Sequence, residues 1–331
     1  MNLETWQSHF EGYTLVGCAV GNRNTLYLLG KANPPEGSKE VWNYELTTRF
    51  VFYMRDDEDP DNRWGSIDFN MLDYPMLAAV KKPESQAVIV DDRRWVFSFN
   101  LDGDQVEPEI PKSLSQGGSV TRLKEIEGYL YAVDSGRCAF YRESSGKWIG
   151  LEEGHVLTQF DGSDLTYAPS FEDIDGFSRC DIYAVGGKGD VWHWNGARWS
   201  QCHFPSNMYL TAVCCGEDGK VYIGAQCGTV FVGRGDDWQM LQKNDYTLPF
   251  KDMVWYEDRV WCTSDYGVYQ IVDGKFTSAV LPLEAAICAG NLSVGDGVLL
   301  LAGVHGAAFL ENGKWESLVN NPEMRQLAEN P

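Results

Sequence analysis

Four glycines in the second half of the chain are separated by a constant interval. They lie at positions 189, 228, 267 and 306, so that 39 residues separate each glycine from the next. Each one closes a short apolar run, as in Asp181–Gly189 or Arg259–Gly267, and a similar run ends earlier at Gly136. An interval repeated this regularly indicates a repeat architecture, in which every unit adds one element of supersecondary structure to its neighbour.

A polar turn and an aromatic residue follow each of these glycines. Pairs such as Asn195-Gly196 and Asn312-Gly313 accept the positive φ angles of two-residue hairpins, so each unit is predicted to contain strand, turn and strand. Upstream strands complete the units and are expected at residues 210–215, 253–256 and 286–289. Four short strands in about 40 residues are typical of one blade of a β-propeller.

The aromatic residues of the repeat have a predicted structural role. They are Trp148, Trp199, Trp238, Phe276 and Trp315. Because the sheet of one blade cannot bury both of its faces alone, we expect these rings to fill the space between adjacent blades rather than to stack on a sugar or a base.

Counting backwards from the clear repeats predicts an all-β fold with about seven four-stranded blades, although six or eight also fit the spacing. The blades are expected in one propeller domain over residues 1–331, at approximately 13–70, 74–110, 119–150, 164–202, 208–242, 250–280 and 285–318. The first blade is predicted to use residues 27–29, 41–44 and 50–54 as strands. An insertion is expected around residues 151–166, and residues 4–10 are expected to add the strand that closes the ring.

Composition narrows the choice of compartment and partner. The chain has 331 residues, 44% of them hydrophobic, and its net charge of −21 repels nucleic acid and anionic membranes and favours cationic partners. An acidic surface that only keeps the protein dispersed is the alternative interpretation. The nine cysteines are odd in number and lack metal-ligand spacing, so we expect buried, reduced thiols. Because no export signal is recognisable either, we expect a cytoplasmic protein.

Catalytic motifs are lacking in the sequence. We find no P-loop, dinucleotide glycine motif, HExxH or GxSxG, and the five histidines are scattered. One acidic run places Asp57, Asp59, Asp61 and Asp68 at positions 1, 3, 5 and 12 of a calcium-type loop. Calcium binding is therefore one hypothesis for this run, and a solvated acidic loop between two strands is the other; no further cofactor is predicted.

The unit Ile182–Trp199 resembles the Trp-ended repeat of bacterial short-repeat propellers and, more loosely, the kelch repeat. The resemblance covers residues 120–318 and departs from kelch in period, which is about 50 residues there. It implies the propeller fold but little about function, because propellers include enzymes, scaffolds and binding proteins.

One face of such a propeller is the usual binding surface. The loops between the second and third strands and the connectors between blades open on the same side, and here they carry aromatic groups beside carboxylates, which suits a basic protein partner. The candidate contact residues are Arg137, Glu152, Glu153, His155, Phe160, Phe204, Tyr209, Asp245, Tyr246, Asp265, Tyr266 and His305. Alternatively, some of these side chains pack onto the ends of the blades.

Two classes of function follow. The first is a monomeric, non-enzymatic binding protein, in its most specific form a bacterial immunity protein that neutralises a cognate basic toxin domain such as a nuclease; a scaffold would differ only in its partner. The second is a hydrolase or lyase with a pocket at the propeller axis, with or without calcium. Neither nucleic acid nor a membrane is an expected partner.

Overall fold

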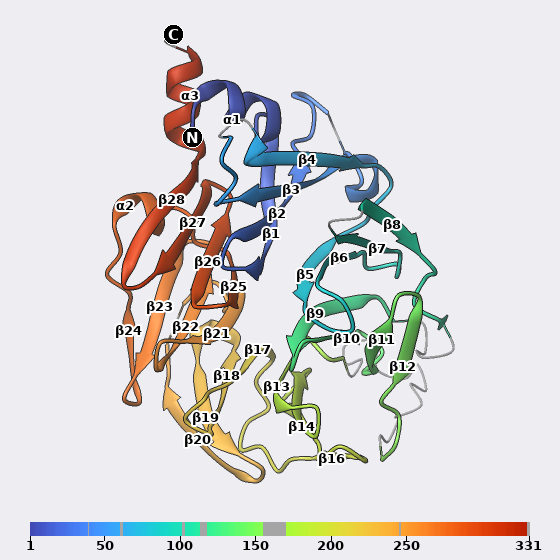
Figure 1. The fold of residues 1–331 in the computed structure, drawn as a ribbon. Coiled ribbons are helices and arrows are strands. Elements are labelled where there is room, and N and C mark those ends of the chain that lie inside the picture. The colour runs from blue at the N-terminus through green and yellow to red at the C-terminus, as the bar shows by residue number, and fades with distance from the viewer. Residues whose placement is uncertain are drawn as a thin grey trace.

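The computed structural model describes residues 1–38, 40–59, 62–100, 103–112, 118–154, 170–244 and 246–329. These residues form seven four-stranded antiparallel sheets arranged as blades around one axis (Figure 1). The prediction of an all-β propeller is confirmed, and the blade count is seven rather than six or eight. No helix within these ranges is long and apolar enough to cross a bilayer.

The first three blades take up the N-terminal half of the chain. Their strands are β1 (Tyr13–Asn22), β2 (Thr25–Ala32), β3 (Thr48–Met54) and β4 (Trp64–Phe69); β5 (Met76–Val80), β6 (Gln86–Val90), β7 (Val96–Asn100) and β8 (Gly103–Glu107); and β9 (Val120–Ile126), β10 (Tyr129–Asp134), β11 (Ala139–Ser144) and β12 (Lys147–Gly150). In each blade the first strand lies at the axis and the fourth at the outside.

The other four blades contain the regular repeats. Their strands are β13 (Asp173–Ser178), β14 (Asp181–Gly186), β15 (Asp190–Trp194) and β16 (Trp199–Gln201); β17 (Leu210–Cys215), β18 (Val221–Ala225), β19 (Val230–Arg234) and β20 (Asp237–Gln242); β21 (Asp252–Tyr256), β22 (Arg259–Ser264), β23 (Gly267–Val272) and β24 (Lys275–Ser278); and β25 (Asn291–Gly295), β26 (Val298–Gly303), β27 (Gly306–Glu311) and β28 (Lys314–Asn320).

The outer-strand aromatics pack against the preceding blade. The ring of Trp238 in blade five lies 6.3 Å from that of Tyr183 in blade four, and Trp315 in blade seven lies 5.9 Å from Trp261 in blade six. Trp148 is buried in one hydrophobic cluster with strands of blade two. The core of the protein is therefore a ring of clusters between neighbouring blades, with each blade covering the apolar face of the next.

Ring closure differs from the sequence prediction. Residues 4–10 do not form a strand: they lie in and just after helix α1 (Leu3–His9), which Asn2 caps by accepting the Thr5 N–H at 2.8 Å. Trp6 and Phe10 are four residues apart, so they face the same side of the segment and are both buried. Trp6 Nε1 donates to Asn321 Oδ1 at 2.9 Å, at the start of helix α3 (Asn321–Glu329), and so joins the two ends of the chain.

Two further predicted strands are wrong. Residues 41–44 lie in the loop between β2 and β3, whose described residues contain the 3-10 turn η1 (Asn43–Glu45) and no strand. Residues 286–289 begin with the last residue of the short helix α2 (Leu283–Ala286), and the inner strand of that blade begins only at Asn291. Both segments are apolar enough for a strand, but tertiary packing places them in connectors.

The cysteines only partly match the expectation of buried thiols. Cys18, Cys202, Cys214, Cys262 and Cys288 are buried, and none of the nine forms a disulfide. Burial raises the pKa of Cys202 and of Cys288 to about 12, which keeps these thiols protonated. Cys180 and Cys227 are exposed, contrary to the prediction.

Two of the periodic glycines permit close approach of two backbone segments. Gly189 has φ +72°, its N–H donates to the Met208 carbonyl at 2.8 Å, and a Cβ at this position would overlap the Ser206 carbonyl oxygen. Gly306 is placed similarly against the Val319 carbonyl oxygen. Gly189 thus lies directly against the connector that follows its blade, and Gly306 lies against β28, each at a spacing that only glycine allows.

We expect Gly189→Ala to lower the free energy of unfolding clearly more than Gly235→Ala. Gly235 also has a positive φ, +60°, but a Cβ there would meet no atom within 4 Å. Its substitution carries only the left-handed backbone penalty of about 1–2 kcal/mol. Overlap should add about 1–3 kcal/mol at Gly189. Urea denaturation of both variants measures the difference, and equal losses would contradict the close approach.

Candidate functional site

The two sides of the propeller carry different kinds of chain connection. Because successive strands alternate in direction, the seven loops between second and third strands open on the same side as the connectors between blades, and we call this side the loop face. Helix α1 precedes β1 and helix α3 follows β28, so both ends of the chain also lie on this side, and Figure 1 shows the two ends next to each other. The opposite side, built from hairpin turns, is the turn face.

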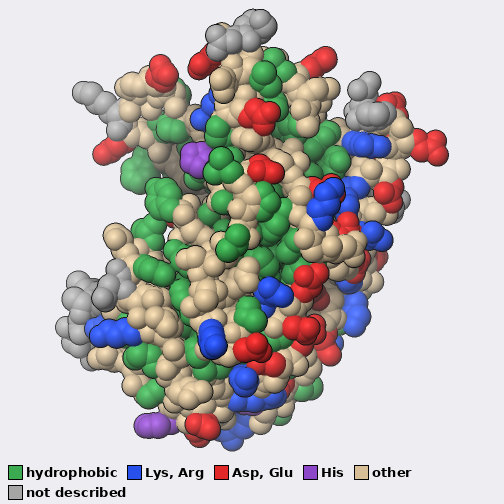
Figure 2. All heavy atoms as spheres, turned by 90° about the vertical axis from the view of Figure 1, so that its left-hand side faces the viewer, with side chains coloured by type: hydrophobic (Ala, Val, Ile, Leu, Met, Phe, Trp, Pro, Cys, Tyr) green, Lys and Arg blue, Asp and Glu red, His purple; other side chains and the backbone are tan. Residues whose placement is uncertain are grey.

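Exposed apolar side chains gather on the loop face. Of the twelve large hydrophobic residues that are exposed within the described ranges, eight belong to its loops and connectors: Trp42, Met71, Tyr74, Tyr209, Tyr266, Val280, Leu283 and Val304. The others are Met1 and Leu327 near the chain ends and Val106 and Met240 on outer strands. In Figure 2 the ring is seen from the side, and charged side chains crowd the right-hand edge while hydrophobic ones are more frequent toward the left.

The loop face is also acidic. Its described loops and connectors expose the carboxylates of Glu36, Glu40, Glu45, Glu109, Glu152, Glu153, Asp265 and Glu284, against the cations of Arg93, Lys112, Lys188 and Lys243. Exposed carboxylates such as Glu257 and Asp258 are frequent on the turn face too. Apolar exposure rather than charge therefore distinguishes the two faces, as expected of a protein-binding surface.

Three of the predicted contact residues belong to the packing beneath the loop face. Arg137 is buried, forms an ion pair with Asp190 and lies 5.5 Å above the Trp192 ring. Two predicted aromatics pack against neighbouring rings: Phe204 lies 4.9 Å from Phe231, and Tyr246 stacks on Tyr269 at 5.2 Å. A partner could reach Arg137 only by breaking its ion pair.

The other predicted residues that the structure describes are open to solvent. Tyr266 is 84% exposed and Tyr209 is 40% exposed, with its hydroxyl donating to Glu172. Asp265 accepts a hydrogen bond from Lys251 at 2.8 Å. Glu152, Glu153 and His305 are also exposed. His155, Phe160 and Asp245 lie outside the described residues.

Sequence reasoning missed the apolar residues of blade one. Trp42 is 64% exposed, Tyr74 is 66% exposed and Met71 is 50% exposed, in the loop before β3 and in the connector from β4 to β5. Trp42 lies within residues 41–44, which the sequence analysis assigned to a strand rather than to a surface loop. For Met71 and Tyr74 the sequence did hold a signal, because they lie in a short connector between β4 and β5. A connector this short has little room to bury two large apolar side chains.

The acidic run does not form a twelve-residue loop. Asp57 and Asp59 lie in the turn before β4, where the Asp59 N–H donates to Asp57 Oδ1 at 3.0 Å. Asp68 is the fifth residue of β4 and accepts two hydrogen bonds from Arg49, at 2.6 and 2.7 Å, which lower its pKa. At about 3.3 Å per residue, β4 carries Asp68 away from the turn. Asp61 lies outside the described residues, and no group of three or more potential metal ligands occurs within them.

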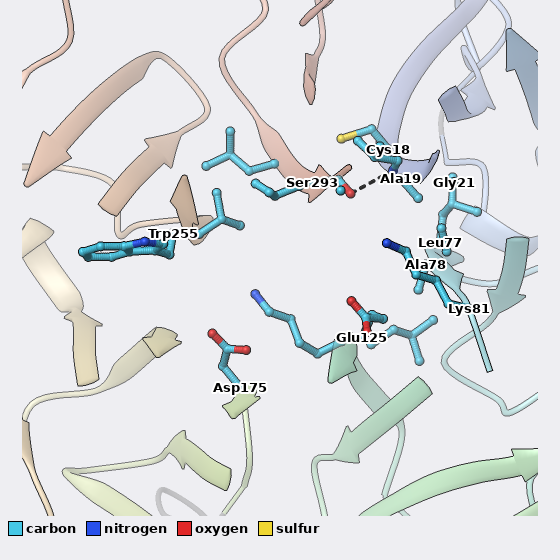
Figure 3. A pocket seen from close by; sticks show the side chains of 18 of the residues that line it. Cys18, Ala19, Gly21, Leu77, Ala78, Lys81, Glu125, Asp175, Trp255 and Ser293 are labelled. Atoms are coloured by element: carbon cyan, nitrogen blue, oxygen red, sulfur yellow. Dashed lines mark hydrogen bonds between the residues drawn. The ribbon is translucent and has the colours of Figure 1, made fainter. Parts of the chain in front are cut away.

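An axial cavity of about 270 Å³ lies inside the ring. The inner strands of all seven blades line it, and Figure 3 shows Trp255, Asp175, Glu125 and Lys81 around the opening, with Ser293 above. Its lining includes Gly21, Lys81 and Glu217 at the ends of inner strands, so the cavity opens toward the turn face.

The charged groups at the axis compensate one another. Arg122 Nε lies 2.9 Å from Asp173 Oδ1, and its Nη2 reaches across to Asp252 Oδ1 at 3.3 Å. Burial by itself would lower the pKa of Arg122, but these two carboxylates outweigh it and raise the pKa. The pKa of Lys124 is raised in the same way, against burial, with Asp175 as the strongest contributor. This arrangement holds the inner strands together and stabilises the charges in place.

Inner-strand carboxylates also link consecutive blades directly. Asp173 Oδ2 accepts the Val213 N–H at 2.8 Å, and Asp252 Oδ2 accepts the Leu292 N–H at 3.0 Å, each across 40 residues of sequence. The axial aspartates are therefore already occupied by structural hydrogen bonds.

Comparison with solved structures supports the fold only. YCF48 from Cyanidioschyzon merolae superimposes with a TM-score of 0.59 at 14% identity, covering 94% of this chain and 96% of that one. Virginiamycin B lyase from Staphylococcus aureus gives 0.56 at 13% identity over 73% and 83% of the two chains. Sqt1 from Saccharomyces cerevisiae gives 0.56 at 8% identity over 95% and 87%. At such low identity, likeness of fold does not indicate function.

No protein-family model matches the sequence. A curated protein of Pseudomonas aeruginosa, immune protein Tsi7, is 31% identical over 237 residues, which span 70% of this chain and 76% of Tsi7. The similarity therefore extends over most of both propeller-sized chains. The chain belongs to the family of the immune protein Tsi7, and it is an immunity protein with a seven-bladed propeller fold.

Proposed function

We propose that this immunity protein neutralises a cognate basic toxin domain by binding it, without catalysis, as a cytoplasmic monomer that uses its loop face. The observation that carries the proposal is the concentration of exposed apolar residues there, eight of twelve among the described residues, within an acidic surround. Apolar anchors exclude water from an interface, and carboxylates around them attract a cationic partner and repel unsuitable ones.

The axis gives less support to an enzymatic function. Arg122, Asp173 and Asp252 pair with one another, and both aspartates also accept backbone N–H groups. A general acid or base must be free to exchange a proton with a substrate, and these carboxylates are already engaged by Arg122 and by backbone N–H groups. Charged groups that neutralise one another in this way suit a structural role. The loop face therefore remains the candidate binding surface.

Co-expression in a bacterial host tests this function. We expect cells that produce the cognate toxin domain to grow like toxin-free cells when the chain is also produced. Because attraction between opposite charges is screened by salt, we also expect the association rate of the purified pair to fall by about tenfold or more between low and high ionic strength.

The control is an outer-strand variant, Met240→Ala, which should protect as well as the parent chain because Met240 lies outside the loop face. Growth arrest that persists in the presence of the folded chain would contradict the proposal. Protection without any detectable complex between the purified proteins would contradict neutralisation by binding.

A further inference from the structure

Building on the proposed function, we propose that Trp42, Met71 and Tyr74 form the energetic centre of the toxin interface. We name these three residues the blade-one anchor. The geometry points to a toxin segment in which an apolar side chain lies next to a lysine or an arginine. The apolar side chain would pack on the anchor, and the cation would meet the carboxylates beside it.

The anchor residues come from two segments that are tied together. Asn43 Oδ1, next to Trp42 in the sequence, accepts the Tyr74 N–H at 2.8 Å. Arg93 donates to the Met71 carbonyl, and its guanidinium lies 5.6 Å from the ring of Tyr44. Three large, exposed apolar side chains thus stand close together on one part of the loop face. Tryptophan and tyrosine are the residue types that most often dominate binding energy at protein interfaces.

The connector that carries Met71 and Tyr74 is held in an unfavourable backbone conformation. Both residues have positive φ angles, +70° and +40°, which bulky side chains rarely adopt. The surroundings impose this conformation: the buried Lys31 ammonium donates to the Leu72 carbonyl at 2.7 Å. Asp73 makes two hydrogen bonds through its backbone. Its N–H donates to Asp91 Oδ2 at 3.3 Å, and its carbonyl accepts the Asp92 N–H at 3.0 Å.

Backbone strain of this kind gathers at binding sites, where the fold holds a side chain in position in advance. A connector fixed at every residue from 71 to 74 loses little conformational entropy when a partner docks. Strain, rigidity and apolar exposure coincide here, whereas Tyr266, in blade six of the same face, is exposed without a positive φ.

The charge beside the anchor defines the partner. Asp73, Asp91 and Asp92 lie close enough to affect one another, and Asp92 Oδ1 is buried without a hydrogen-bond partner among the described residues. Burial and the two neighbouring aspartates raise the pKa of Asp92 to about 6. Two cations lie in this cluster and both are engaged: Arg93 pairs with Asp91 at 3.3 Å and donates to the Met71 carbonyl, and Lys31 donates to the Leu72 carbonyl at 2.7 Å. A toxin lysine or arginine would supply the missing positive charge.

Two substitutions test the anchor by calorimetry on the full chain, with an inactivated form of the cognate toxin domain as the ligand. Trp42→Ala removes one exposed ring. Tyr74→Gly removes a second ring and at the same time suits the positive φ, so it should keep or raise the thermal midpoint while binding is lost. We expect each variant to weaken binding by about 30-fold or more.

The matched controls are Met240→Ala and Val106→Ala, which remove exposed apolar side chains from the outer strands of blades five and two, outside the loop face. Both should bind nearly as tightly as the parent chain. If the two anchor variants bind the toxin domain as tightly as the parent chain, the proposed role of the blade-one anchor is wrong, while the proposed toxin-binding function is retained. If the parent chain does not bind the toxin domain, the proposed function fails and the anchor fails with it.

Discussion

Replacing Arg142 with methionine is expected to lower the free energy of unfolding by about 3–5 kcal/mol, because it leaves a buried carboxylate without its counter-charge. The side chains of Arg142 and Glu107 are 1% and 0% exposed. Arg142 Nε donates to Glu107 Oε2 at 3.0 Å, and its Nη2 donates to Gln86 Oε1 at 2.8 Å. These bonds join β11 of blade three to β6 and β8 of blade two.

Chemical denaturation measures the loss, and two controls define its cause. Arg23→Met removes a pair with Glu311 in which the arginine is 62% exposed, so it should cost no more than about 1 kcal/mol. The double variant Arg142→Met, Glu107→Leu should recover much of the stability, since no unpaired charge is left. If the single and double variants are equally unstable, lost packing rather than the unpaired charge explains the result.

Acid sensitivity follows from the same pair. Burial alone would raise the pKa of Glu107, but the hydrogen bonds from Arg142 and the Gly146 N–H outweigh it and lower the pKa below its ordinary value of 4.5. A carboxyl whose pKa is lower in the folded state stabilises the protein above pH 4.5 and loses this contribution as the pH falls through the folded value. The double variant should therefore lose less stability on acidification than the parent chain.

Trp6→Ala is expected to cost about 3–5 kcal/mol as well. Trp6 is 2% exposed, in a cluster that includes β1 and β2 of blade one and β26 to β28 of blade seven, and it donates to Asn321 at 2.9 Å. Its removal leaves a cavity at the closure of the ring and a buried amide oxygen without its donor. Amide hydrogen exchange should speed up most in blades one and seven.

The control for ring closure is Leu327→Ala, on the exposed side of helix α3, where the leucine is 45% exposed. Its cost should stay within about 0.5 kcal/mol. A similar cost for the two substitutions, or faster exchange spread evenly over all blades, would contradict closure through Trp6.

The repeat made most of the fold predictable. From Val120 onward, apart from the insertion around residues 151–166, glycines, turns and aromatics recur with little variation, because every blade there must bury the same faces. Blade one lacks this regularity, since the loop between β2 and β3 is long, and local apolar patterning at residues 41–44 was mistaken for a strand. The amphipathic spacing of Trp6 and Phe10 indicates a helix only once the Asn2 cap is noticed.

The candidate site was less predictable than the fold, since burial depends on contacts between segments distant in sequence. Phe204 and Tyr209 lie in one connector, yet the first packs on Trp238 at 5.4 Å and the second is exposed. Arg137 pairs with Asp190 of the next blade, which no local pattern indicates. The loop face follows from topology, whereas its individual contact residues required the structure.

Hydroxyl-radical footprinting of the chain, alone and in complex with the inactivated toxin domain, tests the central claim most directly. The method reports on exposed sulfur-containing and aromatic side chains, which here occupy distinct regions. Trp42, Met71 and Tyr74 lie on the loop face, Met240 on an outer strand and the exposed Cys180 in a hairpin turn of the turn face. The account predicts that the toxin protects the loop-face residues and leaves Met240 and Cys180 as reactive as before. Protection of Cys180 with unchanged oxidation of the loop-face residues would contradict it.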